Sequence, residues 1–274
     1  MSAILELTSS RPTKGLSMDS RVDAFSDKAE NYLKYRAGYP DSLLDFLASE
    51  CGLTAESVVA DLGSGTGTLT RMLLGHVNSV YAVEPNPDMR AVAERLFSTN
   101  DGFKSIDATA EATTLPDRSV DFVTAGRALQ WFDVSATLAE TSRILRPQGW
   151  AVFVWNRRKQ PETDFNLAYK EFLTSFCGNF REQMERRRIA REYLDRSGYR
   201  FNAIDFQHQV NLQQLKGLVL SLSISPNEGD PDFESMVKRI EEMFATHQVN
   251  GHVTFDYSTL VYAKRFLINR DCGS

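Results

Sequence analysis

Three glycines and two carboxylates are spaced so that they could hold a small ligand. Gly63, Gly65 and Gly67 alternate along the chain, and Asp61 comes two residues before the first of them. Glycine permits a positive φ and lets a ligand lie against bare backbone. Glu84 follows 17 residues after Gly67. An acid at the end of a neighbouring strand can accept hydrogen bonds from ribose hydroxyls. The pattern therefore predicts a nucleoside-binding site.

The glycine spacing separates two classes of ligand. Dinucleotide-binding folds use G-x-G-x-x-G, and the position of their third glycine is Thr68 in this chain. An acid at the end of the strand also suits a ligand with an ammonium group better than one with a pyrophosphate. The apolar residues 57–62 predict a buried parallel strand before the turn, and residues 67–75 predict a helix after it. The free N–H groups of that helix would face the ligand.

Strands and helices alternate along the first half of the chain. The expected strands are 57–62, 79–83, 103–108, 120–125 and 151–155, and the expected helices are 21–36, 41–51, 67–75, 88–97 and 135–145. Such alternation predicts right-handed βαβ units around a parallel sheet. Pro147 and Gly149 predict a turn before the fifth strand.

The second half has a different pattern. Residues 204–210 and 260–266 predict a closing pair of strands on the same sheet. Residues 162–196, 212–222 and 233–244 are helical in period and are interpreted as insertions over the ligand edge. The expected organisation is a disordered segment 1–20, a single domain 21–267 with a helical lid at about 160–200 and 212–250, and a tail 268–274.

Composition excludes several classes of protein. The 274 residues are 42% hydrophobic, enough for a sizeable core, and the net charge of −5 differs from that of a basic nucleic-acid binder. Glutamates interleave with Arg186–Arg188, which favours a solvated helix over an RNA-binding surface. Three scattered cysteines and four scattered histidines predict neither a disulfide framework nor a metal site. Without a membrane-length apolar run or a signal peptide, a cytoplasmic protein is expected.

The glycine run resembles motif I of the class I S-adenosylmethionine-dependent methyltransferases. Phe25-Ser-Asp-Lys-Ala29, Tyr32 and Tyr35-Arg-Ala-Gly-Tyr-Pro40 are similar to the entry of their type-11 group, which includes trans-aconitate methyltransferase-like enzymes. Segments 221–226 and 255–262 also resemble this group, so the resemblance spans about residues 21–267. It implies a Rossmann-like α/β fold with a seven-stranded, mostly parallel sheet, helices on both faces, and S-adenosyl-L-methionine as the cofactor.

The resemblance also implies a set of cofactor-binding residues. Arg36 would pair with the cofactor carboxylate, since arginine can hold a carboxylate bidentately. Tyr32 would shield the sulfonium, since an aromatic face attracts a cation. The adenine contact stays open between Thr109 and Asp107. The full implied set is Tyr32, Arg36, Asp61, Gly63, Ser64, Gly65, Thr66, Glu84, Pro85, Asn86, Met89, Thr109, Ala110, Glu111, Gly126, Arg127 and Ala128.

Gln130 and Trp131 are the expected catalytic residues, facing the point of methyl transfer. The family often has a histidine where this chain has Gln130, and a glutamine cannot act as a general base. A carboxylate acceptor would need no base. The acceptor is expected to be a small molecule. Arg127, Arg157 and Arg158 favour an anionic one, whereas the aromatic residues Trp131, Phe132 and Trp155 favour a lipophilic one.

Two other functions stay open at this stage. The first is a NAD(P)-dependent reductase on a similar sheet, which Asp61 and Thr68 argue against. The second is a cofactor-binding protein without turnover, which Gln130 leaves open. The expected assembly is a monomer or homodimer, with no nucleic-acid, membrane or metal partner.

Overall fold

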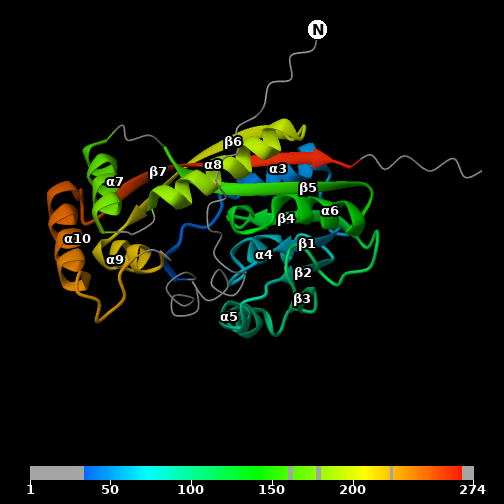
Figure 1. Ribbon diagram of the computed structural model, residues 1–274, viewed down its shortest axis with the longest axis horizontal. Coiled ribbons are helices and arrows are strands. Elements are labelled where there is room, and N and C mark those ends of the chain that lie inside the picture. The colour runs from blue at the N-terminus through cyan, green and yellow to red at the C-terminus, as the bar shows by residue number, and fades with distance from the viewer. Residues whose placement is uncertain (1–33, 160–162, 177–179, 223–224, 267–274) are drawn as a thin grey trace, which may run out of the picture.

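The computed structural model describes residues 34–159, 163–176, 180–222 and 225–266, and a single seven-stranded sheet runs through this part of the chain (Figure 1). The strands are β1 (Val58–Leu62), β2 (Ser79–Val83), β3 (Phe103–Ile106), β4 (Val120–Gly126), β5 (Leu145–Arg158), β6 (Arg200–Val210) and β7 (Val253–Arg265). Their order is β3-β2-β1-β4-β5-β7-β6. β1 to β5 are parallel, and β7 is antiparallel to β5 and β6. The expected Rossmann-like sheet and its closing pair are confirmed.

Helices connect most of the strands and cover both faces of the sheet. They are α3 (Ser42–Cys51), α4 (Thr68–Leu73), α5 (Pro87–Phe97), α6 (Val134–Ile144), α7 (Asp164–Phe176), α8 (Phe180–Arg196), α9 (Leu212–Leu220), α10 (Phe233–His247) and the 3-10 turn η2 (Leu129–Trp131). In β1, Val59 packs with Leu43 and Leu69 of α3 and α4, whereas Ala60 belongs to the core that Leu194 of α8 joins. Burial on both faces explains the continuous apolar run of this strand.

A third core lies beyond the carboxyl end of β5. Helices α7, α9 and α10 gather there, at the left of Figure 1. Their side chains Phe165, Leu215 and Ile240 pack with Val253 and Phe255 of β7. We call α7, α9 and α10 the cap helices. They come from the segments expected to form insertions over the ligand edge.

Helix α8 comes from the same insertion but packs elsewhere. Its buried residues Ala190 and Leu194 share a core with Leu129 of η2 and Phe153 of β5. Helix α8 therefore covers a face of the sheet. Its arginines are paired with glutamates of the same helix: Arg186 with Glu182 at 2.8 Å, and Arg188 with Glu185 and Glu192. The ion pairs agree with a solvated helix.

The strand boundaries differ from expectation mainly at β5 and β7. Leu145 pairs with Val120 and Trp150 with Phe122, so residues 146–149 bulge out of a strand that begins six residues early. The expected turn is therefore a bulge inside β5, with Gln148 at φ 70°. β7 begins at Val253 and not at residue 260, because its first half pairs with β6. β6 likewise begins at Arg200, and β3 ends at Ile106.

Part of the expected organisation lies outside the described residues. The segment 1–20, Tyr32, most of the expected helix 21–36 and the tail 268–274 belong to this part. Lys34, Tyr35 and Arg36 of that helix are described, and the first two are helical.

Candidate functional site

The glycine turn joins β1 to α4, and all three of its glycines have a positive φ. The angles are 60° at Gly63, 58° at Gly65 and 83° at Gly67. A Cβ at Gly63 would lie 2.7 Å from the ring of Phe132, and one at Gly67 would lie 2.4 Å from the ring of Phe97. Among the described residues, a Cβ at Gly65 would meet nothing within 4 Å. Packing thus requires the outer glycines, and only the middle one leaves space for a ligand.

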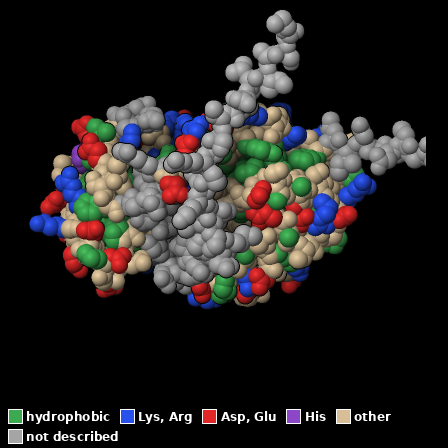
Figure 2. Space-filling model, viewed as in Figure 1, with side chains coloured by type: hydrophobic (Ala, Val, Ile, Leu, Met, Phe, Trp, Pro, Cys, Tyr) green, Lys and Arg blue, Asp and Glu red, His purple; other side chains and the backbone are tan. Residues whose placement is uncertain are grey.

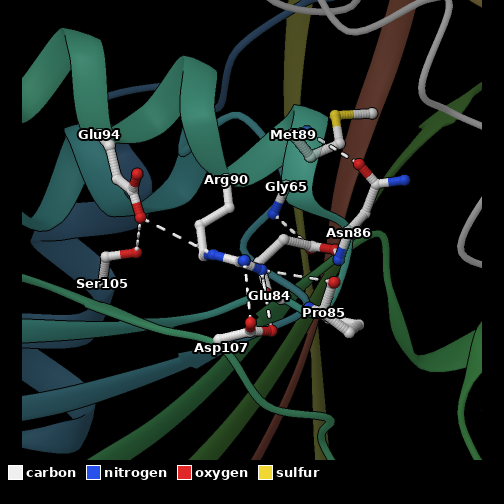
Figure 3. A network of polar contacts seen from close by, with 9 residues as sticks. All are labelled: Gly65, Glu84, Pro85, Asn86, Met89, Arg90, Glu94, Ser105 and Asp107. Carbon is white, nitrogen blue, oxygen red and sulfur yellow. Dashed lines mark hydrogen bonds and ion pairs between the residues drawn. The ribbon is translucent and has the colours of Figure 1, made fainter.

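Glu84 holds the turn to the end of β2. Its carboxylate accepts hydrogen bonds from the Gly65 N–H at 2.8 Å and from the Asn86 N–H at 2.9 Å (Figure 3). The residue is 9% exposed, and burial raises the pKa of the carboxyl group. Each carboxylate oxygen can accept more than one hydrogen bond. Glu84 can therefore bind ribose hydroxyls while it keeps the turn in place.

Asn86 and Met89 continue this network into α5. The Asn86 side chain caps the helix by accepting a hydrogen bond from the Met89 N–H at 2.9 Å. Pro85 links Glu84 to this cap, and its carbonyl accepts a hydrogen bond from Arg90 at 3.3 Å. The residues expected around the nucleoside, from Gly65 to Met89, thus form one connected group (Figure 3).

Arg90 contacts Asp107, one of the two residues that the sequence left open for the adenine contact. The Arg90 guanidinium binds both carboxylate oxygens of Asp107, at 2.9 and 3.0 Å (Figure 3). It also donates to the carbonyl of Glu84 at 2.9 Å. Asp107 therefore has a partner within the fold, and the sequence analysis did not identify Arg90. The sequence offered one signal for Arg90, which is its position one helical turn after Asn86, the residue that caps α5.

The remaining residues after β3 differ in exposure. Thr109 is half-buried and bridges to Ala112, while Ala110 is 2% exposed. Glu111 accepts a hydrogen bond from the Asp133 N–H at 2.8 Å, next to the start of α6. Ala110 thus belongs to the core, and Glu111 joins this loop to the segment after η2.

Asp61 points into the protein. It is 1% exposed, and its carboxylate accepts hydrogen bonds from the hydroxyls of Thr70 at 2.7 Å and Thr124 at 3.0 Å. Burial raises its pKa to about 6, against the lowering effect of these hydrogen bonds. Asp61 therefore joins β1 to α4 and β4, a role that the sequence did not predict.

The hydroxyl of Thr66 is buried and makes no hydrogen bond to the described residues. The residue itself is fully buried. Neighbouring Ser64 donates its N–H to the carbonyl of Val83 at 3.1 Å. An orphaned hydroxyl beside the open Gly65 position fits a turn that receives a polar ligand.

The end of β4 carries the residues expected near the methionine part of the cofactor. A Cβ at Gly126 would lie 2.5 Å from the hydroxyl of Tyr39, so the tyrosine requires a glycine there. Arg127 has φ 59°, and its guanidinium lies 5.5 Å from the Tyr39 ring and donates to the Ala37 carbonyl at 3.2 Å. Ala128 is buried next to Gly63. Residues 37–39 thus pack over the end of β4.

Gln130 uses both ends of its amide inside the fold. Its Nε2 donates to the Arg127 carbonyl at 2.6 Å, and its Oε1 accepts a hydrogen bond from the Trp155 indole N–H at 2.8 Å. The side chain therefore fastens the turn after β4 to β5. Trp131 ends η2 and is half-buried.

Arg36 lies beside the cap helices. It donates to the hydroxyl of Ser221 at 2.8 Å and to the carbonyl of Ser221 at 3.1 Å, just after α9. The contact ties the entry segment to a cap helix, and Asn156 of β5 holds the same segment through the Gly38 carbonyl at 2.7 Å. The sequence analysis did not identify Asn156.

The described residues also bear on metal binding and on membrane insertion. No cluster of histidine, cysteine, aspartate or glutamate there could hold a metal ion. Among the helices of that part, none has the length and apolar character needed to cross a membrane. The described part of the face shown in Figure 2 carries both acidic and basic side chains.

Comparison with known proteins finds similarity to methyltransferases. Residues 60–153 match the type-11 family described as a methyltransferase domain. An uncharacterized methyltransferase of Mycobacterium tuberculosis is 29% identical over 241 residues, which cover 88% of this chain and 90% of that protein. A malonyl-[acyl-carrier protein] O-methyltransferase of Marinomonas is 33% identical over 162 residues, or 57% and 60% of the two chains.

A solved structure supports the same fold. It is a protein of Anaeromyxobacter dehalogenans assigned as a type II methyltransferase, with a TM-score of 0.59 and 18% identity over 84% of this chain and 98% of that one. The open backbone at Gly65, the orphaned Thr66 hydroxyl and the Glu84 carboxylate suit an adenosyl cofactor. The family match and these relatives support an S-adenosylmethionine-dependent methyltransferase, and the solved structure supports its Rossmann-like fold.

Proposed function

We propose that the protein transfers a methyl group from S-adenosylmethionine to an oxygen atom of a small anionic acceptor. The observation that carries this proposal is the composition of the sheet edge. Arg127 directly follows β4, and Arg158 ends β5. The predicted catalytic residue Gln130 is a neutral amide whose oxygen and nitrogen both make hydrogen bonds within the fold. An edge with cations and without a base at that position suits an acceptor that is already deprotonated.

Cofactor binding is proposed to follow the network at the turn. Glu84 would accept the ribose hydroxyls, and Gly65 would let the nucleoside lie against the backbone. The cofactor supplies an electrophilic methyl group whose leaving group departs as a neutral thioether. The task of the protein is then to hold the acceptor in line with that methyl group and to exclude water.

The alternative of a lipophilic acceptor has less support. Trp155 is 3% exposed, and its indole N–H is bound to Gln130. The Phe132 ring packs against Gly63. These two aromatic side chains serve the core and the turn. The name of the Marinomonas relative refers to O-methyl transfer on a malonyl group, and such a group carries a carboxylate.

The cap helices are proposed to form the lid over the acceptor. They have their own core and stand beyond the carboxyl end of β5. Arg36, through Ser221, would couple the entry segment to that lid. Together with the sheet, they would form the single domain expected for residues 21–267.

The proposal is tested by transfer of a labelled methyl group to a panel of carboxylates, phenols and amines. We expect label in the carboxylates first. Activity confined to amines would contradict the proposal. Calorimetry with S-adenosylhomocysteine and with NADH checks the reductase alternative, because binding of NADH alone at micromolar concentration would overturn the cofactor assignment.

A further inference from the structure

An arginine at the carboxyl end of β5 lies beside two buried aromatic rings that pack against each other. The guanidinium carbon of Arg158 is 4.5 Å from the centre of the Tyr169 ring and 5.7 Å from that of Phe255. Tyr169 of α7 is 2% exposed and Phe255 of β7 is fully buried. Rings on α7 and β7 therefore hold the guanidinium by cation–π attraction, which leaves its N–H groups available to another partner.

Arg158 has a buried N–H group without an acceptor. Its Nη1 is buried and makes no hydrogen bond, and no ion pair within the described ranges includes Arg158. The next residue, Lys159, is in contrast paired with Asp205 at 2.5 Å. A buried donor on a cation is costly when it has no acceptor. The Arg158 guanidinium therefore has an N–H group available to bind an anion.

The register of β5 gives the position of Arg158 relative to the end of β4. Asn156 and Arg158 face the same side of the sheet, because side chains alternate along a strand. Asn156 binds the Gly38 carbonyl, and Arg127 of β4 binds the adjoining Ala37 carbonyl. Gly126 pairs with Val154, and the four residues from there to Arg158 span about 13 Å of strand. Arg158 therefore lies further along β5, on the same face as Asn156 and beyond the contacts that Asn156 and Arg127 make with residues 37 and 38.

We propose that Arg158 is a specificity-determining residue that binds a carboxylate of the acceptor, separate from the atom that receives the methyl group. This inference rests on the proposed function. The planar guanidinium presents paired N–H groups that match a carboxylate bidentately. The two rings fix its orientation, and α7 brings one of them, so the lid itself contributes to recognition.

Calorimetry on the full chain, saturated with S-adenosylhomocysteine, tests the inference with benzoate and succinate as probes and benzamide and succinamide as neutral counterparts. The wild type should bind at least one acid about tenfold more tightly than its amide. Arg158→Met should remove that preference. Arg158→Lys should retain part of it, because lysine keeps the charge but lacks the planar fork.

Arg200→Met is the matched control. Arg200 also stacks on an aromatic ring, that of Trp150 at 5.4 Å, but at the opposite end of the sheet. The Arg200→Met variant should bind the acid in preference to its amide as the wild type does. The inference is overturned if the wild type does not prefer either acid or if Arg158→Met keeps the preference. The proposed function is tested separately: it fails if the wild type does not bind S-adenosylhomocysteine or if it transfers label only to amines.

Discussion

Glu84 holds the fold at the position where it is also proposed to bind the ligand. Both of its carboxylate oxygens accept hydrogen bonds from backbone N–H groups, one from Gly65 in the turn and one from Asn86 at the start of α5. An amide at this position could offer an oxygen to only one of these donors and would place its own NH2 group against the other.

Glu84→Gln should therefore weaken binding of S-adenosylhomocysteine by about 10- to 100-fold, since hydrogen bonds to a charged group contribute roughly 1.5–3 kcal/mol. Titration calorimetry measures the change. Asp107→Asn is the control, because Asp107 is exposed and binds Arg90 outside the turn. Equal losses in the two variants would show that Glu84 does not contact the ligand.

Asp61 has a pKa raised by burial to about 6, from an ordinary value of 3.8. A carboxyl group whose pKa is higher in the folded state stabilises the protein at low pH, and this contribution is lost as the pH rises through that interval. Asp61→Asn removes the titration.

The free energy of unfolding of Asp61→Asn, minus that of the wild type, should therefore rise between pH 3.8 and about 6. The slope should reach at most about 1.4 kcal/mol per pH unit. Urea unfolding at several pH values measures the difference. A difference that does not depend on pH over this range would contradict the raised pKa.

Residue types alone predicted only part of this site. The sequence indicated the positions of Gly65, Glu84 and Asn86, because a glycine turn and a strand end can be recognised locally. It did not indicate that Asp61 would bind Thr70 and Thr124, because Thr124 is 63 residues away and meets Asp61 only through the pairing of β1 with β4.

At the scale of elements, the glycine turn combines a packing role with the proposed binding role. Gly67 has the ring of Phe97 within 2.4 Å of its missing Cβ, whereas a Cβ at Gly65 would meet no described residue within 4 Å. Packing therefore requires the outer glycines, and the middle one is proposed to leave room for the ligand.

Gly65→Ala should lower stability by only about 1–2 kcal/mol, the cost of a left-handed residue with a side chain, yet should weaken binding of S-adenosylhomocysteine at least about tenfold. Gly67→Ala should be the less stable variant, because overpacking adds to the same backbone cost. Thermal unfolding and calorimetry separate the two effects. A Gly65→Ala variant with normal affinity would contradict the placement of the ligand.

The strands show why some boundaries were predicted and others were not. β1 and β2 are short, apolar and bounded by turn residues, so their limits follow from the local sequence. In the first five residues of β7, buried and partly exposed side chains alternate, and Val253, Phe255 and Tyr257 are the buried ones. That alternation was available in the sequence. The bulge at 146–149 was not, because it depends on the register with β4.

At the scale of the whole molecule, the cores divide the chain into a sheet and a cap. Two cores cover the faces of the sheet, and the third lies among α7, α9, α10 and the first half of β7. The third core shares few connections with the central strands β1 and β4, so the cap helices should open without unfolding the sheet.

Hydrogen exchange should therefore show faster exchange in α9 and α10 than in β1 and β4. S-adenosylhomocysteine should slow exchange most at residues 63–67 and 84–89, because its binding stabilises the groups that it contacts. Mass spectrometry resolves these segments. Equal exchange rates in the cap helices and central strands would indicate a single cooperative unit.

The separate core of the cap has a consequence for how this enzyme can evolve. Substitutions among Phe165, Leu215 and Ile240 reshape one end of the molecule, while the hydrogen bonds of Glu84 at the glycine turn stay intact. With the cap as the proposed lid over the acceptor, substitutions there can change which acceptor is bound while binding of the methyl donor stays the same. New substrates can therefore arise without changes at the glycine turn.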